Sequence, residues 1–553
     1  MSDTANATPQ KGAQNSLCRR AWRLLPAVVC VASVIFFLWQ CAGYYREGKG
    51  FTAMVMFGDQ FGGHALPELK ATPHVVMVNS AGYDGQFYAQ IAMRPDLESP
   101  ELDDAVDNLA YRARRILFSW TAHVLAGGNA VGALHVYSVQ NIVCWLLLGW
   151  LLLRRFPPTG WDTFGRWFAV MFSLGLVVSV RSALIDGPAF MVIVIAMTLV
   201  EMRRPWAAAI AFGVSGLGKE TAILGAVALP VPAGRDGRVW GRWILQGVLV
   251  VLPLLLWLLH LRGLFADSHL GQGNFSLPFT GFVKKWAEVW NQELLAGGGS
   301  VFVRSQLSLF SLTVQWLFIV LRPQFHSAWW RLGAVHAVLL IVLGDAVWEG
   351  FPGGVFRVLL PMTLAFNVLV PAGRRWLPVL VLGNLSVVTS FFILGAPPVS
   401  QDAARFEGPR ELMLAPATGK EIGARFDARW SEPENANGQR WRWNSGTAEM
   451  VVRNPHDFPL VAQASLSLQT IEVREVRLLV DGREYWRGRL EAGQTTRVEV
   501  SGIILPPGES VWEFATDIPG RPPAGNPADT RLLAFNLRDC VITLSRGQAP
   551  PPQ

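Results

Sequence analysis

Long apolar runs separated by short polar turns occupy residues 24–396 of this 553-residue chain. A helix needs roughly 20 predominantly apolar residues to cross a bilayer. The pattern therefore predicts an α-helical polytopic membrane domain with about eleven spans, several of them short. The expected spans are 24–43, 134–153, 164–180, 188–200, 206–217, 221–232, 243–261, 306–321, 332–347, 355–371 and 376–396, with a half-span at 116–126.

The pattern changes after about residue 397, where apolar and polar residues alternate in short runs. Alternation with a period of two is typical of half-buried strands, and turn residues separate the runs. Asp481-Gly482, between Val480 and Tyr485, predicts a tight hairpin. We expect a linker at 397–423 and an all-β sandwich domain at 424–553.

The distribution of positive residues predicts the orientation of the chain, because loops rich in Lys and Arg stay in the cytoplasm. Residues 1–23 form a basic N-terminal tail, and alternate turns between the later spans are also basic. This places the tail in the cytoplasm and the first large loop, 46–115, outside together with the C-terminal domain. We expect a bacterial inner membrane with a periplasmic C-terminal domain, although a luminal face obeys the same rule.

Composition excludes some classes of protein. Only 16% of the residues are charged, against roughly 25% in soluble domains. The net charge is +7, but the arginines cluster beside apolar runs, so we expect no nucleic-acid partner. The five cysteines lack metal-ligand spacing, which argues against a zinc site and a disulfide framework.

The first outer loop contains a candidate catalytic carboxylate, Asp84, within residues 79–88. Its neighbours Tyr83 and Gln86 are uncharged, and Gly85 permits a tight turn beside the carboxylate. Such an Asp can remove a proton from an acceptor hydroxyl. The alternative is a turn residue that caps a helix beginning near Gln86.

A basic cluster, 111–118, follows in the same loop and contains Arg112 and Arg115. Arginine binds phosphate oxygens in a bidentate manner, so a lipid phosphate is one partner that would compensate for these charges. Pairing with Asp107 and the neighbouring acidic residues is the alternative.

Two further turns are expected on the outer side. Asp186 lies in the first of them, where pairing with Arg181 is the simple explanation and a functional site the other. Lys219-Glu220 lies in the second, either as a self-neutralised pair or at a helix broken in the membrane. The spelling Gly-Leu-Gly-Lys lacks the spacing of a P-loop, and we reject a nucleotide triphosphatase site.

Arg357 begins an expected span just inside the outer interface. It either extends its side chain towards the polar headgroups or serves as a ligand for phosphate. All of these ionisable groups map to the outer face, and convergence of such groups is typical of a site.

Three motifs together resemble the bacterial multi-pass proteins related to the C-type (GT-C) glycosyltransferases, which act on the outer face with polyprenyl-phosphate sugar donors. The resemblance covers residues 24–396. The motifs are Gly82-Tyr83-Asp84-Gly85-Gln86-Phe87-Tyr88, Tyr111-Arg112-Ala113-Arg114-Arg115-Ile116-Leu117 and Gly218-Lys219-Glu220-Thr221.

This resemblance implies roles for individual residues. Asp84 would be the catalytic base of an inverting transfer. The implied donor phosphate ligands are Arg112, Arg115, Lys219 and Arg357, and the implied supporting residues are Tyr83, Gln86, Asp186 and Glu220. No second acid adjoins Asp84, so the need for a divalent cation stays open and no metal ligand is assigned.

The expected partners are membrane lipids, a lipid-linked sugar donor and a polysaccharide, lipid or protein acceptor. The C-terminal region also resembles a β-sandwich module of bacterial polysaccharide-related proteins, through Arg440-Trp441-Arg442-Trp443 and residues 529–535. The alternative function is non-enzymatic, as a membrane transporter or a scaffold for polysaccharide assembly.

Overall fold

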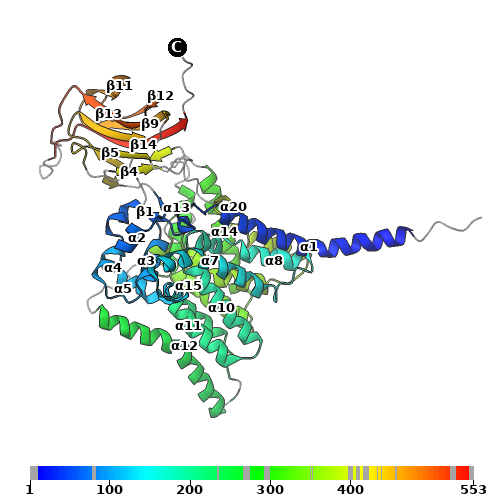
Figure 1. Ribbon diagram of the computed structural model, residues 1–553. Helices are drawn as coiled ribbons and strands as arrows, with labels where there is room; N and C mark the ends of the chain where they lie inside the picture. Colours follow the sequence, from blue (N-terminus) through cyan, green and yellow to red (C-terminus); the bar gives the residue numbers. More distant parts are fainter. Residues whose placement is uncertain are drawn as a thin grey trace, which may run out of the picture. The chain divides into compact units, whose positions relative to one another are not determined.

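The computed structural model divides the chain into two compact units, one helical and one mostly of β-strands (Figure 1). The helical unit comprises Met1–Met56, His64–Val75 and Tyr83–Ala396, and the β unit comprises Phe57–Gly63, Val76–Gly82 and Pro397–Gln553. The structure describes residues 10–77, 82–232, 234, 236–265, 274–291, 299–348, 350, 353–395, 403–405, 411–414, 422–431, 434–436, 439–454, 458–522 and 531–546.

Four described helices are long and apolar enough to cross a membrane. They are Leu24–Ala42 within α1 (Gln10–Ala42), α7 (Ala130–Leu152), α12 (Gly237–Leu264) and Val303–Leu321 within α14 (Gly299–Leu321). Their length and composition define a helical membrane protein.

The number of spans rises to six if two bent pairs each count as one. The expected span 164–180 is broken at Ser173 into α8 (Trp161–Met171) and α9 (Leu174–Arg181), bent by 46°. The expected span 376–396 is likewise divided into η5 (Arg374–Trp376) with α19 (Leu377–Leu382) and α20 (Ser386–Ile393).

Other expected spans form helices shorter than a bilayer is thick. They are α6 (Leu117–Leu125), α10 (Asp186–Glu201), α11 (Pro205–Gly218), the 3-10 helix η4 (Glu220–Ala228), α15 (Ala328–Val342), α17 (Val355–Val358) and α18 (Leu360–Leu369). The count of eleven is therefore not confirmed and stays a prediction.

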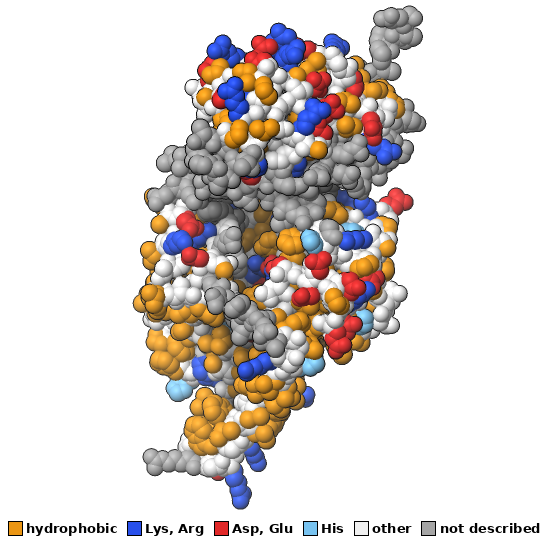
Figure 2. All heavy atoms as spheres, turned by 90° about the vertical axis from the view of Figure 1, so that its left-hand side faces the viewer, with side chains coloured by type: hydrophobic (Ala, Val, Ile, Leu, Met, Phe, Trp, Pro, Cys, Tyr) orange, Lys and Arg blue, Asp and Glu red, His pale blue; other side chains and the backbone are white. Residues whose placement is uncertain are grey.

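Exposed apolar side chains cover the long helices. Ile244, Leu256 and Leu259 of α12 are more than half exposed, and Figure 2 shows hydrophobic side chains gathered over the lower part of the helical unit. Monomeric soluble proteins rarely expose contiguous apolar patches of this kind, whereas hydrocarbon chains cover them without cost.

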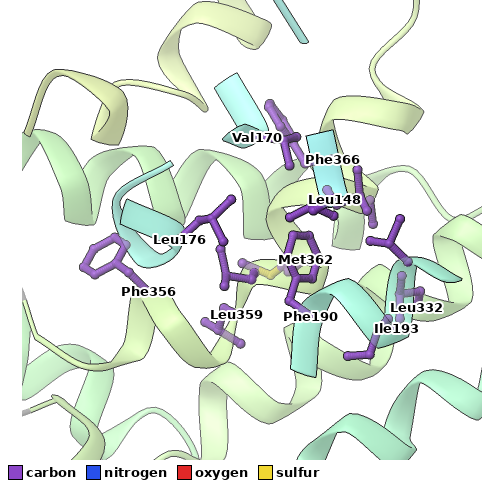
Figure 3. Packing of buried hydrophobic residues seen from close by; sticks show 14 of the residues in the cluster. Leu148, Val170, Leu176, Phe190, Ile193, Leu332, Phe356, Leu359, Met362 and Phe366 are labelled. Carbon is purple, nitrogen blue, oxygen red and sulfur yellow. The ribbon is translucent and has the colours of Figure 1, made fainter. Parts of the chain in front are cut away.

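The core of the helical unit is assembled from elements far apart in the sequence. Leu148 of α7, Val170 of α8, Phe190 of α10, Leu332 of α15 and Met362 of α18 belong to one buried cluster (Figure 3). The same cluster contains residues of α9, α10 and α17. These three helices carry the charged residues Arg181, Asp186 and Arg357.

The outer loop 46–115 is mostly helical in its described parts. It contains η1 (Thr52–Met54), η2 (Asp59–His64), α2 (Pro67–Ala71), α3 (Gly85–Met93), α4 (Pro100–Ala105), α5 (Leu109–Arg112) and η3 (Ala113–Arg115), with the parallel strands β1 (Phe57–Gly58) and β2 (Val76–Met77). α13 (Thr280–Asn291) and α16 (Asp345–Trp348) complete the helical unit.

The β unit contains two six-stranded sheets, ordered β11-β10-β13-β8-β5-β4 and β12-β9-β14-β7-β6, with β3 pairing on β14. Buried residues of both sheets, such as Met450 and Leu466, form a single hydrophobic cluster. The strands are β3 (Ala403–Arg405), β4 (Glu411–Leu414), β5 (Ile422–Phe426), β6 (Glu434–Ala436), β7 (Gln439–Trp443), β8 (Ala448–Asn454), β9 (Leu460–Thr470), β10 (Arg474–Val480), β11 (Arg483–Leu490), β12 (Thr495–Leu505), β13 (Gly508–Thr516) and β14 (Phe535–Arg546).

Two expectations from the sequence, the hairpin and the linker, can be compared with the observed strands. The hairpin at Asp481-Gly482 joins β10 to β11, and both turn residues have positive φ, which is typical of a type I′ turn. The expected linker 397–423 instead contains β3 and β4 and the start of β5, because their backbone groups pair with β14, β5 and β8.

Candidate functional site

Asp84 precedes α3, at the position from which a side chain normally caps a helix. Its carboxylate makes no capping hydrogen bond. It accepts a hydrogen bond of 3.0 Å from Arg112 and lies 3.8 Å from a guanidinium nitrogen of Arg357. The capping alternative is therefore wrong for this side chain, which faces the cations instead.

Gly85 is required by close packing and not by an unusual backbone angle. A Cβ at Gly85 would lie 2.5 Å from the carbonyl oxygen of Ser182 and 2.9 Å from that of Val55. Gly82, three residues earlier, is the one with a left-handed φ, of 71°. The start of α3 thus touches the turn that precedes α10, and this contact brings Asp84 close to Asp186.

Arg112, at the end of α5, is almost fully buried. It donates to both oxygens of Asp107, at 2.9 and 2.7 Å, and to Asp84. Its guanidinium also lies 5.1 Å from the centre of the Phe87 ring. The alternative partner Asp107 is thus one of its two carboxylates, and Arg112 holds Asp84 in place.

Arg115, in η3, donates to Glu220 at 2.8 Å and to the hydroxyl groups of Tyr88 and Tyr111 at 3.0 and 2.8 Å. Burial raises the pKa of Tyr88, and the positive charges of Arg115 and Arg112 oppose that rise. Tyr88 is therefore a neutral hydrogen-bonding group at physiological pH. The Arg115–Glu220 pair connects the outer loop to η4.

Asp186 begins α10 and is 5% exposed, so its charge needs partners. It pairs with Lys219 and with Arg357, the latter at 3.2 Å. The expected pair with Arg181 is not formed, since Arg181 donates to the carbonyl oxygen of Ile393. Lys219 and Glu220 do not neutralise each other either, because they face Asp186 and Arg115 respectively.

Arg357, in α17, lies between Asp84 and Asp186 and 5.5 Å from the centre of the Tyr83 ring. It also lines a small cavity of about 10 Å³, which has room for about one water molecule. Polar lining is provided by Asp186, Lys219, Thr221, His336 and Arg357, and apolar lining by residues such as Phe190.

His336 was not singled out by the sequence, in which it is a lone histidine within an apolar run. It lies on α15 and is buried, with Nδ1 2.9 Å from the carbonyl oxygen of Leu332. Because a carbonyl oxygen only accepts, Nδ1 carries a proton in this contact. His336 therefore adds a polar ring to the wall of the cavity.

The remaining expected site residues differ in exposure. Tyr83 is 37% exposed beside Arg357, whereas Gln86 is 2% exposed at the start of α3 and is not one of the charged contacts. The charged contacts join four carboxylates to four cations: Asp84, Asp107, Asp186 and Glu220 with Arg112, Arg115, Lys219 and Arg357. The described network is thus neutral.

Among the described residues, no group of three or more His, Cys, Asp or Glu side chains is arranged to hold a metal ion. Glu349 and residues 351–352, shortly before Arg357, lie outside the described residues. Asp345, on α16, pairs with Lys284 and does not reach Arg357 through a described contact.

No protein-family model matches the chain, and no curated protein matches its sequence. Among solved structures, the arabinosyltransferase EmbB of Mycobacterium smegmatis aligns over 83% of this chain and 62% of its own, at 11% identity and a TM-score of 0.33. A Podospora anserina GH26-CBM35 β-(1,4)-mannanase aligns over 28% of this chain and 29% of its own, at 11% identity and a TM-score of 0.16.

A family two carbohydrate esterase of Clostridium thermocellum aligns over 24% of this chain and 34% of its own, at 12% identity and a TM-score of 0.15. The chain spans less than two thirds of each of these proteins. At such low TM-scores the likenesses define neither a fold nor an activity, and the functional argument rests on the residues of the site.

Proposed function

We propose that this protein is an inverting membrane glycosyltransferase that moves a sugar from a polyprenyl-phosphate donor to an acceptor on the periplasmic face of a bacterial inner membrane. The observation that carries the proposal is the position of Asp84. Its side chain is 37% exposed, yet it is held by Arg112 and faces Arg357. An accessible carboxylate beside fixed cations suits a base next to a bound phosphate.

The proposed reaction uses Asp84 as the proton acceptor. As the acceptor hydroxyl loses its proton to Asp84, its oxygen attacks the anomeric carbon and the bond from that carbon to the phosphate oxygen breaks. The phosphate leaves with the electron pair of that bond. Attack from the face opposite the phosphate inverts the anomeric centre. General base catalysis of this kind typically contributes roughly 10²–10⁴-fold to the rate.

The cations have two roles in this proposal. Arg112 and Arg115 are occupied by Asp107 and Glu220 and by tyrosine hydroxyls, so they position the loop and Asp84. Lys219 and Arg357 both pair with the buried Asp186, and Arg357 also reaches the accessible Asp84, so we assign these two cations to the donor phosphate. A positive charge fixed in a water-poor site stabilises a developing phosphate charge more strongly than it would in water.

The β unit has its own hydrophobic core and follows the last helix of the membrane domain. We assign it as a periplasmic β-sandwich that engages the polysaccharide, lipid or protein acceptor.

The test is binding of radiolabelled polyprenyl-phosphate sugars to the purified full-length protein. We expect saturable binding for one sugar, weakened in Arg357→Ala and Arg115→Ala and retained in Arg114→Ala. Arg114 provides the control because it has the same charge in the same loop and its described contact is the ring of Tyr111. Failure of every donor to bind would remove the proposal.

A transporter is the second candidate, and the two helix pairs bent by 46° are the observation that favours it. Broken helices surround the substrate sites of many transporters. Uptake of a sugar or lipid into sealed vesicles, without formation of a glycosylated product, would favour this alternative.

A further inference from the structure

The register of the sheet β12-β9-β14-β7-β6 separates its core face from its outer face. Leu537 of β14 belongs to the hydrophobic cluster of the β unit, together with its cross-strand partner Leu468 on β9. Because side chains alternate along a strand, Asn536 and Arg538, on either side of Leu537, face away from that core. The residues that pair with them define the outer face of this sheet.

Two tryptophans lie on this outer face. Trp443 pairs with Asn536 and Trp441 pairs with Arg538, and residues directly opposite each other project from the same face of a sheet. Both tryptophans are partly exposed, whereas Arg442 between them is 3% exposed on the core side. The strand β7 therefore directs its aromatic side chains outward.

Polar side chains complete the outer face. Asn536 pairs on its other side with Gln469 of β9, the strand next to β14 (Figure 1). The guanidinium group of Arg538 lies 4.8 Å from the centre of the Trp441 ring, and its Nε donates to Oδ1 of Asn536 at 3.0 Å. We call this surface the tryptophan face, formed by Trp441, Trp443, Gln469, Asn536 and Arg538.

Two groups of the tryptophan face have hydrogen-bonding capacity that the described residues do not use. The described hydrogen bonds of Trp443 are made by its backbone, so its indole N–H is available. Nδ2 of Asn536 is buried without a hydrogen-bond partner among the described residues. A buried donor of this kind costs stability unless a ligand or water completes it.

The outer face of the other sheet has a different chemistry. Arg487 of β11 pairs there with Glu475 and Glu484, at 3.6 and 3.0 Å. Val511 of β13 is 37% exposed, whereas the next residue, Trp512, is fully buried in the core. This sheet directs charged and aliphatic residues outward, and it provides control positions for the tryptophan face.

The charge of the tryptophan face argues against a strongly anionic ligand. Glu434 of β6 accepts a hydrogen bond of 3.2 Å from the Trp441 indole and pairs with Arg531 at 2.6 Å. Arg538 is the one cation that defines the face, and its other polar members are amides. Nucleic acids and anionic membrane surfaces are instead recognised by clusters of Lys and Arg.

A carbohydrate chain matches the groups of the tryptophan face. The aliphatic C–H groups on one side of a sugar ring can stack on the electron-rich face of an indole, which is a large apolar surface with a polar edge. The sugar hydroxyl groups both donate and accept, so they can bind the amides of Asn536 and Gln469 and the indole N–H of Trp443.

We propose that the tryptophan face is a carbohydrate-binding site, on which Trp443 stacks against a sugar ring and Asn536 donates to a sugar hydroxyl. This inference rests on the proposed function for the role of the bound chain, since it selects a polysaccharide among the acceptors that the β unit could engage. Arg538 acts through its neighbours, because it lies over Trp441 and is held there by Asn536.

The experiment measures binding of the full-length protein, in neutral nanodiscs, to immobilised β-glucan, mannan, arabinogalactan and lipid-free O-polysaccharide. We expect saturable binding to at least one of them. Trp443→Ala removes the indole and should weaken that binding by at least about tenfold, as loss of a Trp contact typically does. Trp443→Phe keeps an aromatic face and should weaken it by less than about threefold.

Asn536→Asp tests the free donor. The carboxylate keeps an oxygen that accepts from Arg538 but has no N–H, so we expect at least about tenfold weaker binding. Val511→Ala and Arg487→Ala, on the outer face of the other sheet, are the controls and should change the affinity by less than about twofold.

A second measurement needs no substitution. The bound polysaccharide should protect Trp443 of the wild-type protein from oxidation by hydroxyl radicals, which mass spectrometry of the digested protein detects, and should leave Val511 as reactive as before. This measurement decides the proposal even where Trp443→Ala fails to fold.

The outcomes separate this inference from the proposed function. Absence of binding to all four polysaccharides overturns the site, as does binding that is unchanged in Trp443→Ala and Asn536→Asp without protection of Trp443. Binding to phosphatidylglycerol vesicles that is lost in the same variants assigns the face to lipid and also overturns it. Binding that follows the variants supports the site, and if the wild type then transfers no sugar, only the proposed function fails.

Discussion

Asp84 and Asp186 approach the same nitrogen of Arg357, at 3.8 and 3.2 Å. The two carboxylates differ in exposure, because the Asp84 side chain is 37% exposed and that of Asp186 is 5% exposed. The buried Asp186 holds Arg357 and Lys219 in place, whereas Asp84 remains accessible to a substrate. Asp186 is therefore a structural carboxylate, and Asp84 is a candidate base. We expect substitution of Asp186 to lower stability and substitution of Asp84 to lower activity.

Substitution Asp84→Asn should abolish sugar transfer while leaving the fold intact. The amide cannot accept the proton, so we expect the rate to fall roughly 10²–10⁴-fold. Arg112 retains Asp107, and Arg357 retains Asp186, so no buried cation loses its last partner. Product formation from a radiolabelled donor, together with a thermal unfolding curve, measures both effects. Wild-type turnover in this variant would contradict the mechanism.

Substitution Asp186→Asn should instead destabilise the helical unit. It leaves the positive charge of Lys219 buried and uncompensated, and breaking a buried pair in this way typically costs about 3–5 kcal/mol. Asp107→Asn is the control, because its side chain is 34% exposed and Arg112 still has Asp84. Thermal unfolding in detergent measures the difference. Equal unfolding temperatures for the two variants would show that the buried pair is not the stabilising contact.

The sequence predicted the elements whose pattern is local. The apolar runs that became α1, α7, α12 and α14 are long enough to be recognised on their own. Alternation and the Asp-Gly turn located the hairpin of β10 and β11 for the same reason. For these helices and this hairpin, the residues of the segment itself were enough to predict the element.

The broken helices could not be predicted in this way, because the reasons for the breaks lie in other segments. A Cβ at Gly175 would clash with the carbonyl oxygen of Phe356, so α9 packs directly against α17 just after the break, a contact that the sequence does not show. The apolar run around Ser173 looks continuous when this contact is unknown.

The candidate site was also predicted only in part: the sequence identified its charged residues but not their partners. The sequence singled out Asp84, Arg112, Lys219 and Arg357 as charged residues in unusual places. It paired some of them wrongly, because sequence neighbours such as Lys219 and Glu220 were the only partners it offered, whereas the fold gives them Asp186 and Arg115. The position of His336 depends entirely on the packing of α15.

Substitution Gly85→Ala should lower the rate of sugar transfer strongly and lower the unfolding temperature only modestly. The added methyl group would meet the carbonyl oxygens of Ser182 and Val55, so the start of α3 and Asp84 must move. Displacement of a catalytic group by about 1 Å can cost roughly 10²-fold in rate. Gly165→Ala in α8 is the matched control, because a Cβ there meets nothing within 4 Å. We expect this control to be fully active, with stability unchanged or raised by about 0.5–1 kcal/mol.

Measured kcat and unfolding temperatures of the two glycine variants decide this prediction. Equal activity in Gly85→Ala and Gly165→Ala would mean that the position of Asp84 does not limit the reaction.

The β unit should fold without the helical unit. Its buried cluster is formed by residues between Phe426 and Ile542, so a fragment of residues 397–553 contains that whole core. We expect cooperative thermal unfolding of this fragment by circular dichroism.

Trp512→Ala should lower the stability of this fragment by about 3–5 kcal/mol, because the Trp512 side chain is fully buried among the apolar residues of the two sheets. The neighbouring Val511, which is 37% exposed, provides the control, and Val511→Ala should change stability by less than about 1 kcal/mol. A fragment without a cooperative transition would show that the core is not sufficient and that the strands depend on the rest of the chain.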